Sequence, residues 1–340
     1  MTLHRRSAFA PVQAGRIALA IPPLLAALIS LAQAQVFRDE IVPEGHWALE
    51  IARFEQRQDS AFDRYEKLRS LRSYLLPDRK AYEAASGHVE RDVSETDLRL
   101  TYGFTDRFNL FIELPYLELN QDSSLTTSST RDLFIREAET FESQSLSGFG
   151  DARVLLMHRL VFSDRNAFIW GYGLSYPISD RSESEPGLYA LALSSPNPKL
   201  LSFFHYTRYP RAEHTRFDLR VEAQSGLTGE IETLEAGTQN YRSGTGATVE
   251  AGYYFEGGPL GLGLSLQERY LGQSKLSGIG QSDRQSETVV RGQAGYGNLS
   301  ELEQGPLSFP YQVRLILDRS LRGYNVPYRD GVALSILFLF

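Results

Sequence analysis

Charged side chains occupy every second position in several segments of the sequence, with apolar side chains between them. The clearest case runs from Phe217 to Ala223, where Asp218, Arg220 and Glu222 alternate with apolar residues. Successive residues of a strand point to opposite faces of a sheet, so this segment has one charged face and one apolar face. A mixed-sign charged face can filter solutes, or it can form ion pairs that fill an enclosed space.

Ten charged residues fall on such faces. If the apolar faces contact lipid, the charged faces must point inward, because an Arg or Lys facing lipid at the bilayer midplane costs about 2–4 kcal/mol. We therefore predict that these residues line a lumen, and both interpretations of their role, filter or ladder, remain open. The candidate lumen-lining residues are Arg99, Glu113, Arg153, Arg159, Asp218, Arg220, Glu222, Glu250, Arg314 and Asp318.

The sequence shows no pattern typical of a catalytic or metal site. It has six His and no Cys, which excludes disulfides and thiolate ligands. His158 and His205 fall in predicted strands, but neither has a Ser and an Asn or Asp spaced to place a nucleophile beside it. The histidines do not cluster as metal ligands do. We expect no catalytic residue, metal or cofactor, and keep an outer-membrane hydrolase of the phospholipase type as the alternative.

The segments with alternating patterns have the length of membrane-crossing strands. Residues 259–273 carry Leu260, Leu262, Leu264 and Leu266 on one face, and residues 108–119 show the same period. Strands of soluble proteins are usually about 5–6 residues long, whereas a tilted strand needs about 9–11 residues to cross the hydrocarbon layer. The fold class predicted is therefore all-β: a closed antiparallel transmembrane β-barrel of the bacterial outer-membrane type.

Twelve strands are predicted, an even number that leaves both chain termini on the periplasmic side. Short turns at one end alternate with longer loops at the other, the extracellular loops being expected at about 56–92, 120–148 and 180–198. In the turn 105–107, Asp106 is expected to accept hydrogen bonds from the backbone. The predicted strands are 46–55, 93–104, 108–119, 149–162, 167–179, 199–209, 215–227, 243–256, 259–273, 288–299, 307–320 and 331–340.

The two ends of the sequence agree with export to the outer membrane. Residues 1–34 have a basic start, an apolar stretch and a small-x-small ending at Ala34, which is typical of a cleaved signal peptide. The barrel domain would then be 35–340, beginning at Gln35. At the other end an apolar alternating run finishes in Phe340, which resembles the closing strand of bacterial outer-membrane barrels and is predicted to close this one.

Composition limits the partners. Removing residues 1–34 lowers Lys plus Arg from 35 to 32 against 42 Asp plus Glu, a net charge of −10. This acidic balance argues against a nucleic-acid partner. The expected partners are outer-membrane lipid and lipopolysaccharide, the barrel-assembly machinery and a small-molecule solute.

Two motifs resemble a known family. Residues 102–116, YGFTDRFNLFIELPY, and residues 148–160, GFGDARVLLMHRL, are similar to a hairpin and to the following strand of the outer-membrane transporters labelled MetA-pathway of phenol degradation. Residues 170–177, WGYGLSYP, resemble the next strand of that family. The resemblance covers four predicted strands well, and it implies a porin-like channel linked to uptake of aromatic or other hydrophobic compounds.

Function is predicted from the polar inward faces. They indicate a passive channel for small molecules, and about ten residues before the first strand are too few for the plug of an energy-coupled transporter. A structural or adhesive barrel without transport is a further alternative.

Within loop 56–92, the spacing of Phe62, Tyr65 and Leu68 predicts an amphipathic helix ending at Pro77.

Overall fold

The computed structural model describes most of the barrel domain. The predicted signal peptide, residues 1–34, lies outside the described residues. The described residues are 42–63, 65–71, 84–86, 88–124, 126–128, 143–163, 165–179, 193–195, 197–210, 214–233, 237–257, 259–280, 284–297 and 310–340.

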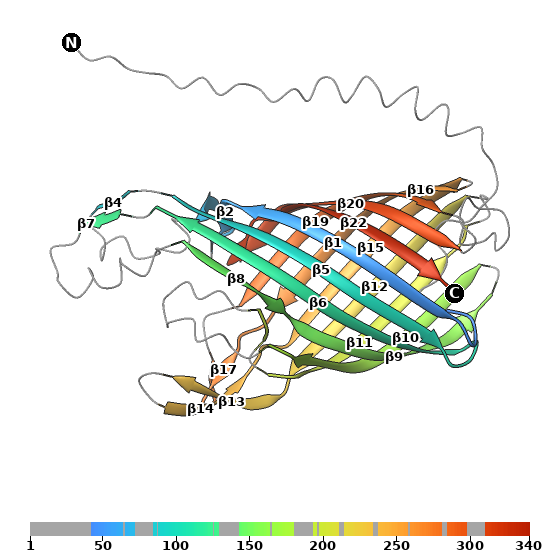
Figure 1. Cartoon of the computed structure of the whole chain (residues 1–340), viewed down its shortest axis with the longest axis horizontal. Helices are drawn as coiled ribbons and strands as arrows, with labels where there is room; N and C mark the ends of the chain where they lie inside the picture. The colour runs from blue at the N-terminus through green and yellow to red at the C-terminus, as the bar shows by residue number, and fades with distance from the viewer. Residues whose placement is uncertain are drawn as a thin grey trace, which may run out of the picture.

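Twelve long strands form one antiparallel sheet that closes on itself (Figure 1). β1 pairs with β5 on one side and with β22 on the other, from Ala48 opposite Leu339 to Gln56 opposite Gly331. The predicted twelve-stranded barrel is therefore confirmed. The strands are β1 (Trp47–Gln58), β5 (Val89–Gly103), β6 (Phe108–Ser123), β9 (Asp151–Phe162), β10 (Asn166–Pro177), β11 (Lys199–Arg208), β12 (Thr215–Gly226), β15 (Gly246–Gly257), β16 (Leu260–Leu271), β19 (Gln285–Gly297), β20 (Tyr311–Tyr324) and β22 (Asp330–Leu339).

The seam between first and last strands extends to Phe340. The backbone N–H of Phe340 donates to the Trp47 carbonyl at 2.9 Å, and the Trp47 N–H donates back to the Phe340 carbonyl at 2.7 Å. Closure leaves no open edge, which lipid would not tolerate because it offers no partner to free backbone groups.

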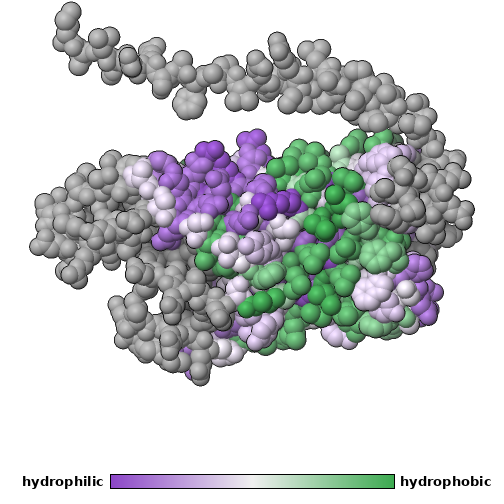
Figure 2. Space-filling model, viewed as in Figure 1, coloured by the Kyte–Doolittle hydropathy of each residue, from purple (hydrophilic) through white to green (hydrophobic). Residues whose placement is uncertain are grey.

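Alternation along each strand separates an apolar exterior from a polar interior. On β16, Leu264 is 62% exposed while its neighbour Ser265 is 4% exposed, because odd positions there point into the barrel. Figure 2 shows the exposed apolar residues gathered in a band over part of the barrel wall, with hydrophilic residues beyond it. In β1 the outward face changes from Ile51 to Arg53, which pairs with Glu118 at 2.9 Å. The strands therefore continue past the apolar band into a polar zone.

Connections differ between the two ends of the barrel. At the end that we call the short-turn end, β5 joins β6 through residues 104–107 and β9 joins β10 through residues 163–165. The Thr105 hydroxyl accepts from the N–H groups of Arg107 at 3.1 Å and Phe108 at 3.0 Å. The prediction that Asp106 accepts these hydrogen bonds is therefore wrong, because Thr105, one position earlier, accepts them.

The opposite end, which we call the long-loop end, carries additional short strands (Figure 1). β8 (Gln144–Phe149) extends the line of β9 along β6, and Gly150 separates the two. The remaining strands form three small sheets, which are β2 (Ser60–Phe62), β3 (Leu68–Ser70) and β21 (Val326–Pro327); β4 (Ala84–Ser86) and β7 (Thr126–Ser128); and β13 (Thr228–Thr233), β14 (Gly237–Arg242), β17 (Lys275–Leu276) and β18 (Ile279–Gly280).

The helix predicted in loop 56–92 is wrong for its first part, where β2 and β3 form a hairpin. Asp63 determines this turn, because its carboxylate accepts from the backbone N–H groups of Tyr65 at 2.8 Å and Lys67 at 3.0 Å. Ala61 and Leu71 are fully buried with Val89 of β5, so the hairpin packs against the barrel. The end of the predicted helix, at Pro77, lies outside the described residues. No helix in the part of the chain that the structure describes is long and apolar enough to cross a membrane.

Residues 42–46 fold into the short-turn mouth of the barrel. The Asn109 side chain donates to the Val42 carbonyl at 2.8 Å, and the Gly45 N–H donates to the Gly103 carbonyl at 2.8 Å. A Cβ on Gly103 would lie 2.1 Å from the Pro43 carbonyl oxygen, so only glycine allows this approach. The chain thus narrows the mouth before β1 begins.

The apolar exterior predicts the effect of a charge at its centre. Leu264→Arg should destabilise folding into lipid vesicles by about 2–4 kcal/mol, because a guanidinium would face hydrocarbon. Leu321→Arg, on the outward face of β20 beyond Arg319, should cost about 0–1 kcal/mol. Denaturant titration of the vesicle-folded protein measures both, and equal losses would contradict the placement of the band.

Candidate functional site

The barrel encloses two adjoining cavities. The one nearer the short-turn end has a volume of about 930 Å³ and the other about 840 Å³. They share a set of lining residues, mostly charged, that we call the belt; seven of these residues are Arg and four are Glu, so the belt has both signs. The belt consists of Glu50, Arg99, Glu113, Arg153, Arg216, Arg220, Glu222, Thr248, Glu250, Gln267, Arg269, Arg291 and Arg314.

One part of the belt is a compact ion-pair cluster on neighbouring strands. Arg99 of β5 pairs with Glu113 of β6 at 2.7 Å, with Asp97 at 2.7 Å and with Glu50 of β1 at 3.4 Å. Arg314 of β20 completes the cluster by pairing with Glu50. Because antiparallel pairing puts Glu50, Arg99 and Glu113 at matched positions, the register itself brings these charges together.

A second cluster lies on β15, β16, β19 and β20. Arg291 binds Asp318 through two parallel contacts, Nε to Oδ1 at 2.7 Å and Nη2 to Oδ2 at 2.8 Å. Its Nη1 also lies 3.4 Å from Glu250, whose carboxylate accepts from Ser265 at 2.6 Å and from Gln267 at 3.3 Å. A bidentate arginine with hydrogen-bonded partners holds its wall in one geometry.

A third cluster lies within the wall near the short-turn end. Arg216 pairs with Asp218 at 2.7 Å and with Glu256 at 3.1 Å, and its guanidinium lies 4.9 Å from the centre of the Tyr254 ring. His205 Nε2 lies 3.6 Å from Asp218. The carboxylate of Asp218 is thus buried beside the Arg216 guanidinium and the His205 ring.

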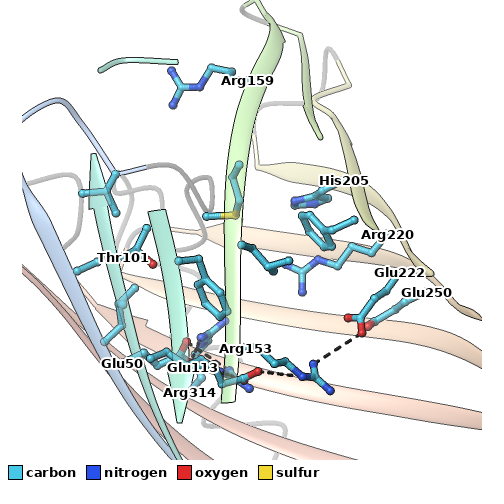
Figure 3. A pocket seen from close by; sticks show the side chains of 18 of the residues that line it. Glu50, Thr101, Glu113, Arg153, Arg159, His205, Arg220, Glu222, Glu250 and Arg314 are labelled. Atoms are coloured by element: carbon cyan, nitrogen blue, oxygen red, sulfur yellow. Dashed lines mark hydrogen bonds and ion pairs between the residues drawn. The ribbon is translucent and has the colours of Figure 1, made fainter. Parts of the chain in front are cut away.

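Arg153 is held differently from the other arginines of these clusters (Figure 3). Its Nε lies 3.5 Å from Glu113 and its Nη1 3.7 Å from Glu222 of β12, three strands away. Its side chain is 40% exposed. Within the described residues these two long ion pairs are its polar contacts, so Arg153 reaches across the lumen and is loosely bound.

The structure places nine of the ten candidate residues at the cavities. Arg159 borders only the cavity near the short-turn end, and Asp318 only the other. Asp218 borders neither, because it is buried under Arg216 and His205. The residues at both cavities are Arg99, Glu113, Arg153, Arg220, Glu222, Glu250 and Arg314.

Sequence reasoning missed several charged residues of the belt. Glu50 lies between Ala48 and Ala52, and Arg291 begins a polar alternation with Gln293. The same period-two pattern is therefore present around these residues. It is harder to recognise there because the inward faces of their strands also carry small residues. Arg269 was missed because the neighbouring Glu268 breaks the outward apolar face; Glu268 lies beyond the apolar band and pairs with the exposed Arg322 at 3.8 Å.

One side of the cavity near the short-turn end is apolar, and we call it the apolar wall. It consists of Phe111 of β6, Leu155 and Met157 of β9, and Leu201 and Phe203 of β11. Met157 forms a buried cluster with Ile169 of β10, against which Phe111, Leu155 and Phe203 pack. The irregular alternation of residues 199–209 has its cause here, because Leu201 and Phe203 face the lumen while Leu200 and Phe204 face outward.

Glycines on β10 make room for this wall. A Cβ on Gly171 would meet Met157 Cγ at 3.4 Å and Phe203 Cβ at 3.6 Å, so side chains from the flanking strands lean over it. Gly173 is needed for a different reason, because a Cβ at this position would lie 1.8 Å from the Val154 carbonyl oxygen. The parts of the wall on β9 and β11 thus flank a strand that has no side chain at two inward positions.

Around His205, the residues that the structure describes do not form a hydrolytic centre. Thr207 and Asp218 both approach the same nitrogen of His205, Nε2, at 3.1 Å and 3.6 Å. A Ser-His-Asp relay needs the two partners on opposite ring nitrogens. His158 stacks on Phe108 at 4.2 Å between ring centres. Among the described residues, no three His, Cys, Asp or Glu side chains form a potential metal site.

Comparison with solved structures agrees with this architecture. The COG4313 outer membrane channel from Pseudomonas putida F1 is similar over 91% of this chain and 100% of that one, with a TM-score of 0.62 and 17% identity. The fold is that of a bacterial outer-membrane channel.

More distant barrels score lower. The β domain of the Bordetella autotransporter BrkA is 8% identical over 87% of this chain and 99% of that one, with a TM-score of 0.44. The P. putida toluene transporter TodX is 9% identical over 92% of this chain and 93% of that one, with a TM-score of 0.40. Scores below 0.5 are too low to indicate shared detail. No family model matches the chain, and neither does any curated protein.

The second cluster predicts a stability difference. Asp318→Ala should lower the free energy of unfolding by about 3 kcal/mol, because it leaves Arg291 without its bidentate partner in a buried site. Glu268→Ala removes an exposed pair and should cost less than about 1 kcal/mol. Denaturant unfolding in detergent compares the two variants; a smaller loss for Asp318→Ala would show that the cluster does not stabilise the barrel.

Proposed function

We propose that the protein is a passive channel of the bacterial outer membrane for small molecules. The observation that carries this proposal is the pair of adjoining cavities inside a closed barrel with an apolar exterior. Solvent-filled space on both sides of a charged belt is what a selective pore requires. In outer-membrane barrels the short-turn end faces the periplasm and the long loops face outside.

The composition of the lumen indicates which solutes suit it. The ion pairs of the belt follow part of its wall, and the apolar wall offers a surface for hydrophobic groups beside them. This supports passage of aromatic or other hydrophobic compounds, as the resemblance to the MetA-pathway transporters implies, and we propose membership of that family on the motifs in residues 102–116 and 148–160.

Several expectations complete the proposal. Residues 1–34 would direct export, and the mature protein would contact outer-membrane lipid and lipopolysaccharide after insertion by the barrel-assembly machinery.

Loops 56–92 and 120–148 are joined by the β4–β7 sheet, in which Ala84 to Ser86 pair with Ser128 to Thr126. A joined pair of loops at the long-loop end can control entry to the lumen.

Single-channel recording tests the channel. The purified mature protein should produce discrete conductance steps in planar bilayers, and Arg153→Ala should raise the conductance by about twofold because it removes a side chain that crosses the lumen. Arg322→Ala, outside the apolar band, should leave it unchanged. A folded barrel that never conducts would overturn the proposal.

Enzyme activity is the competing function, and it has its own test. Refolded protein should release no product from phospholipid or ester substrates, because Thr207 and Asp218 both approach Nε2 of His205, whereas a Ser-His-Asp relay needs its partners on opposite ring nitrogens. Turnover that His158→Ala or His205→Ala abolishes would replace the channel proposal with a hydrolase.

A further inference from the structure

The apolar wall ends at an ion pair. Arg153 precedes Leu155 by two residues on β9, so the two side chains lie on the same, lumenal face of the strand. Glu222 of β12 lies opposite Phe203 of β11 in the strand register. Figure 3 shows Arg153 and Glu222 directed toward each other from different strands. A solute that lies on the apolar wall would thus have its polar end beside one cation and one anion.

This pair is longer than the tightest ion pairs of the first two clusters. Arg153 Nη1 and Glu222 Oε1 are 3.7 Å apart, whereas Arg99–Glu113 and Arg291–Asp318 contacts measure 2.7 Å. Both side chains are more than a third exposed, to water in the lumen. Arg153 is therefore a guanidinium whose planar donors are available to a ligand carboxylate.

We infer that the apolar wall and the Arg153–Glu222 pair form a subsite for a small zwitterion with an apolar body, the chemistry of an apolar α-amino acid. The inference rests on the proposed channel function and names its solute class. The solute carboxylate binds the Arg153 guanidinium, its ammonium binds the Glu222 carboxylate, and its side chain contacts Phe111, Leu155 and Phe203. The cavity, at about 930 Å³, holds such a molecule with water.

Charge balance selects the zwitterion over singly charged solutes. A neutral zwitterion that enters the Arg153–Glu222 pair replaces one contact by two and adds no net charge to the lumen. A monoanion would bind Arg153 but meet Glu113 and Glu222 within reach of the same guanidinium. A monocation would bind Glu222 but meet Arg153. Like charges in such an enclosed site oppose binding.

Isothermal titration calorimetry of the full chain in detergent tests the subsite, with L-phenylalanine as the probe. We expect saturable binding of L-phenylalanine. Phenylpropionate lacks the ammonium, phenethylamine lacks the carboxylate and L-alanine lacks the apolar body, so each should bind at least about tenfold more weakly, one lost contact being worth roughly that factor. Equal binding of phenethylamine or phenylpropionate would overturn the assignment.

Matched variants locate the binding. Arg153→Gln and Glu222→Gln should each weaken L-phenylalanine binding at least about tenfold. Arg322→Gln and Glu268→Gln make the same chemical changes in an exterior ion pair of nearly equal length, 3.8 Å, and should leave binding unchanged. If the exterior variants lost as much affinity as the lumenal ones, the subsite would be refuted. If a lumenal variant fails to fold, the comparison of the four ligands on the wild-type protein still decides the proposal.

Conductance separates this inference from the proposed function. Single-channel steps without L-phenylalanine test the channel alone. Binding without conductance would overturn the channel and leave the subsite, whereas conductance with no L-phenylalanine binding would overturn the subsite and leave the channel.

Discussion

Backbone hydrogen bonding in lipid is the constraint on which the rest of this structure depends. Hydrocarbon offers no partner to an unpaired N–H or C=O, so the sheet must close, and β22 must meet β1. Closure then gives every strand one face toward lipid and one toward the interior. The charges of Arg99 and Arg291 are inside because facing lipid at the midplane would cost about 2–4 kcal/mol for each, and Glu113 is inside because a lipid-facing carboxylate is also unfavourable.

The interior that results is divided by chemistry around its circumference. From β6 through β9 and β10 to β11, Phe111, Met157 and Phe203 present hydrocarbon and aromatic groups to the lumen. On the remaining strands, ion pairs such as Arg291–Asp318 hold charged side chains against the wall, and Arg99 of β5 binds Glu113 at the edge of the apolar arc, on β6. Arg153 lies on β9, within the apolar part of the lumen, but its charged group interacts with the ion-paired part. Its side chain therefore extends from β9 to Glu222 of β12.

Strand positions were predictable because the period-two pattern is strong where lipid covers one face. All twelve predicted strands overlap an observed one, and the least regular, residues 199–209, is a strand with apolar residues on both faces. Loops were less predictable. The spacing of Phe62, Tyr65 and Leu68 fits a helix, but the Asp63 carboxylate satisfies two backbone donors in a turn and Ala61 packs against β5. Which side chains meet across the lumen, such as Arg153 and Glu222, depends on barrel curvature, which no local pattern encodes.

The uneven distribution of charge around the lumen makes the width of the lumen most sensitive to ionic strength where ion pairs line it. In molar salt the Debye length is about 3 Å, so the long Arg153–Glu222 attraction would be weakened by counter-ions while the aromatic arc would pack at least as tightly. Electrical recordings in concentrated electrolyte would then sample a wider opening than the one present in dilute solution. The width of the lumen would therefore depend on the bathing solution as well as on the polypeptide.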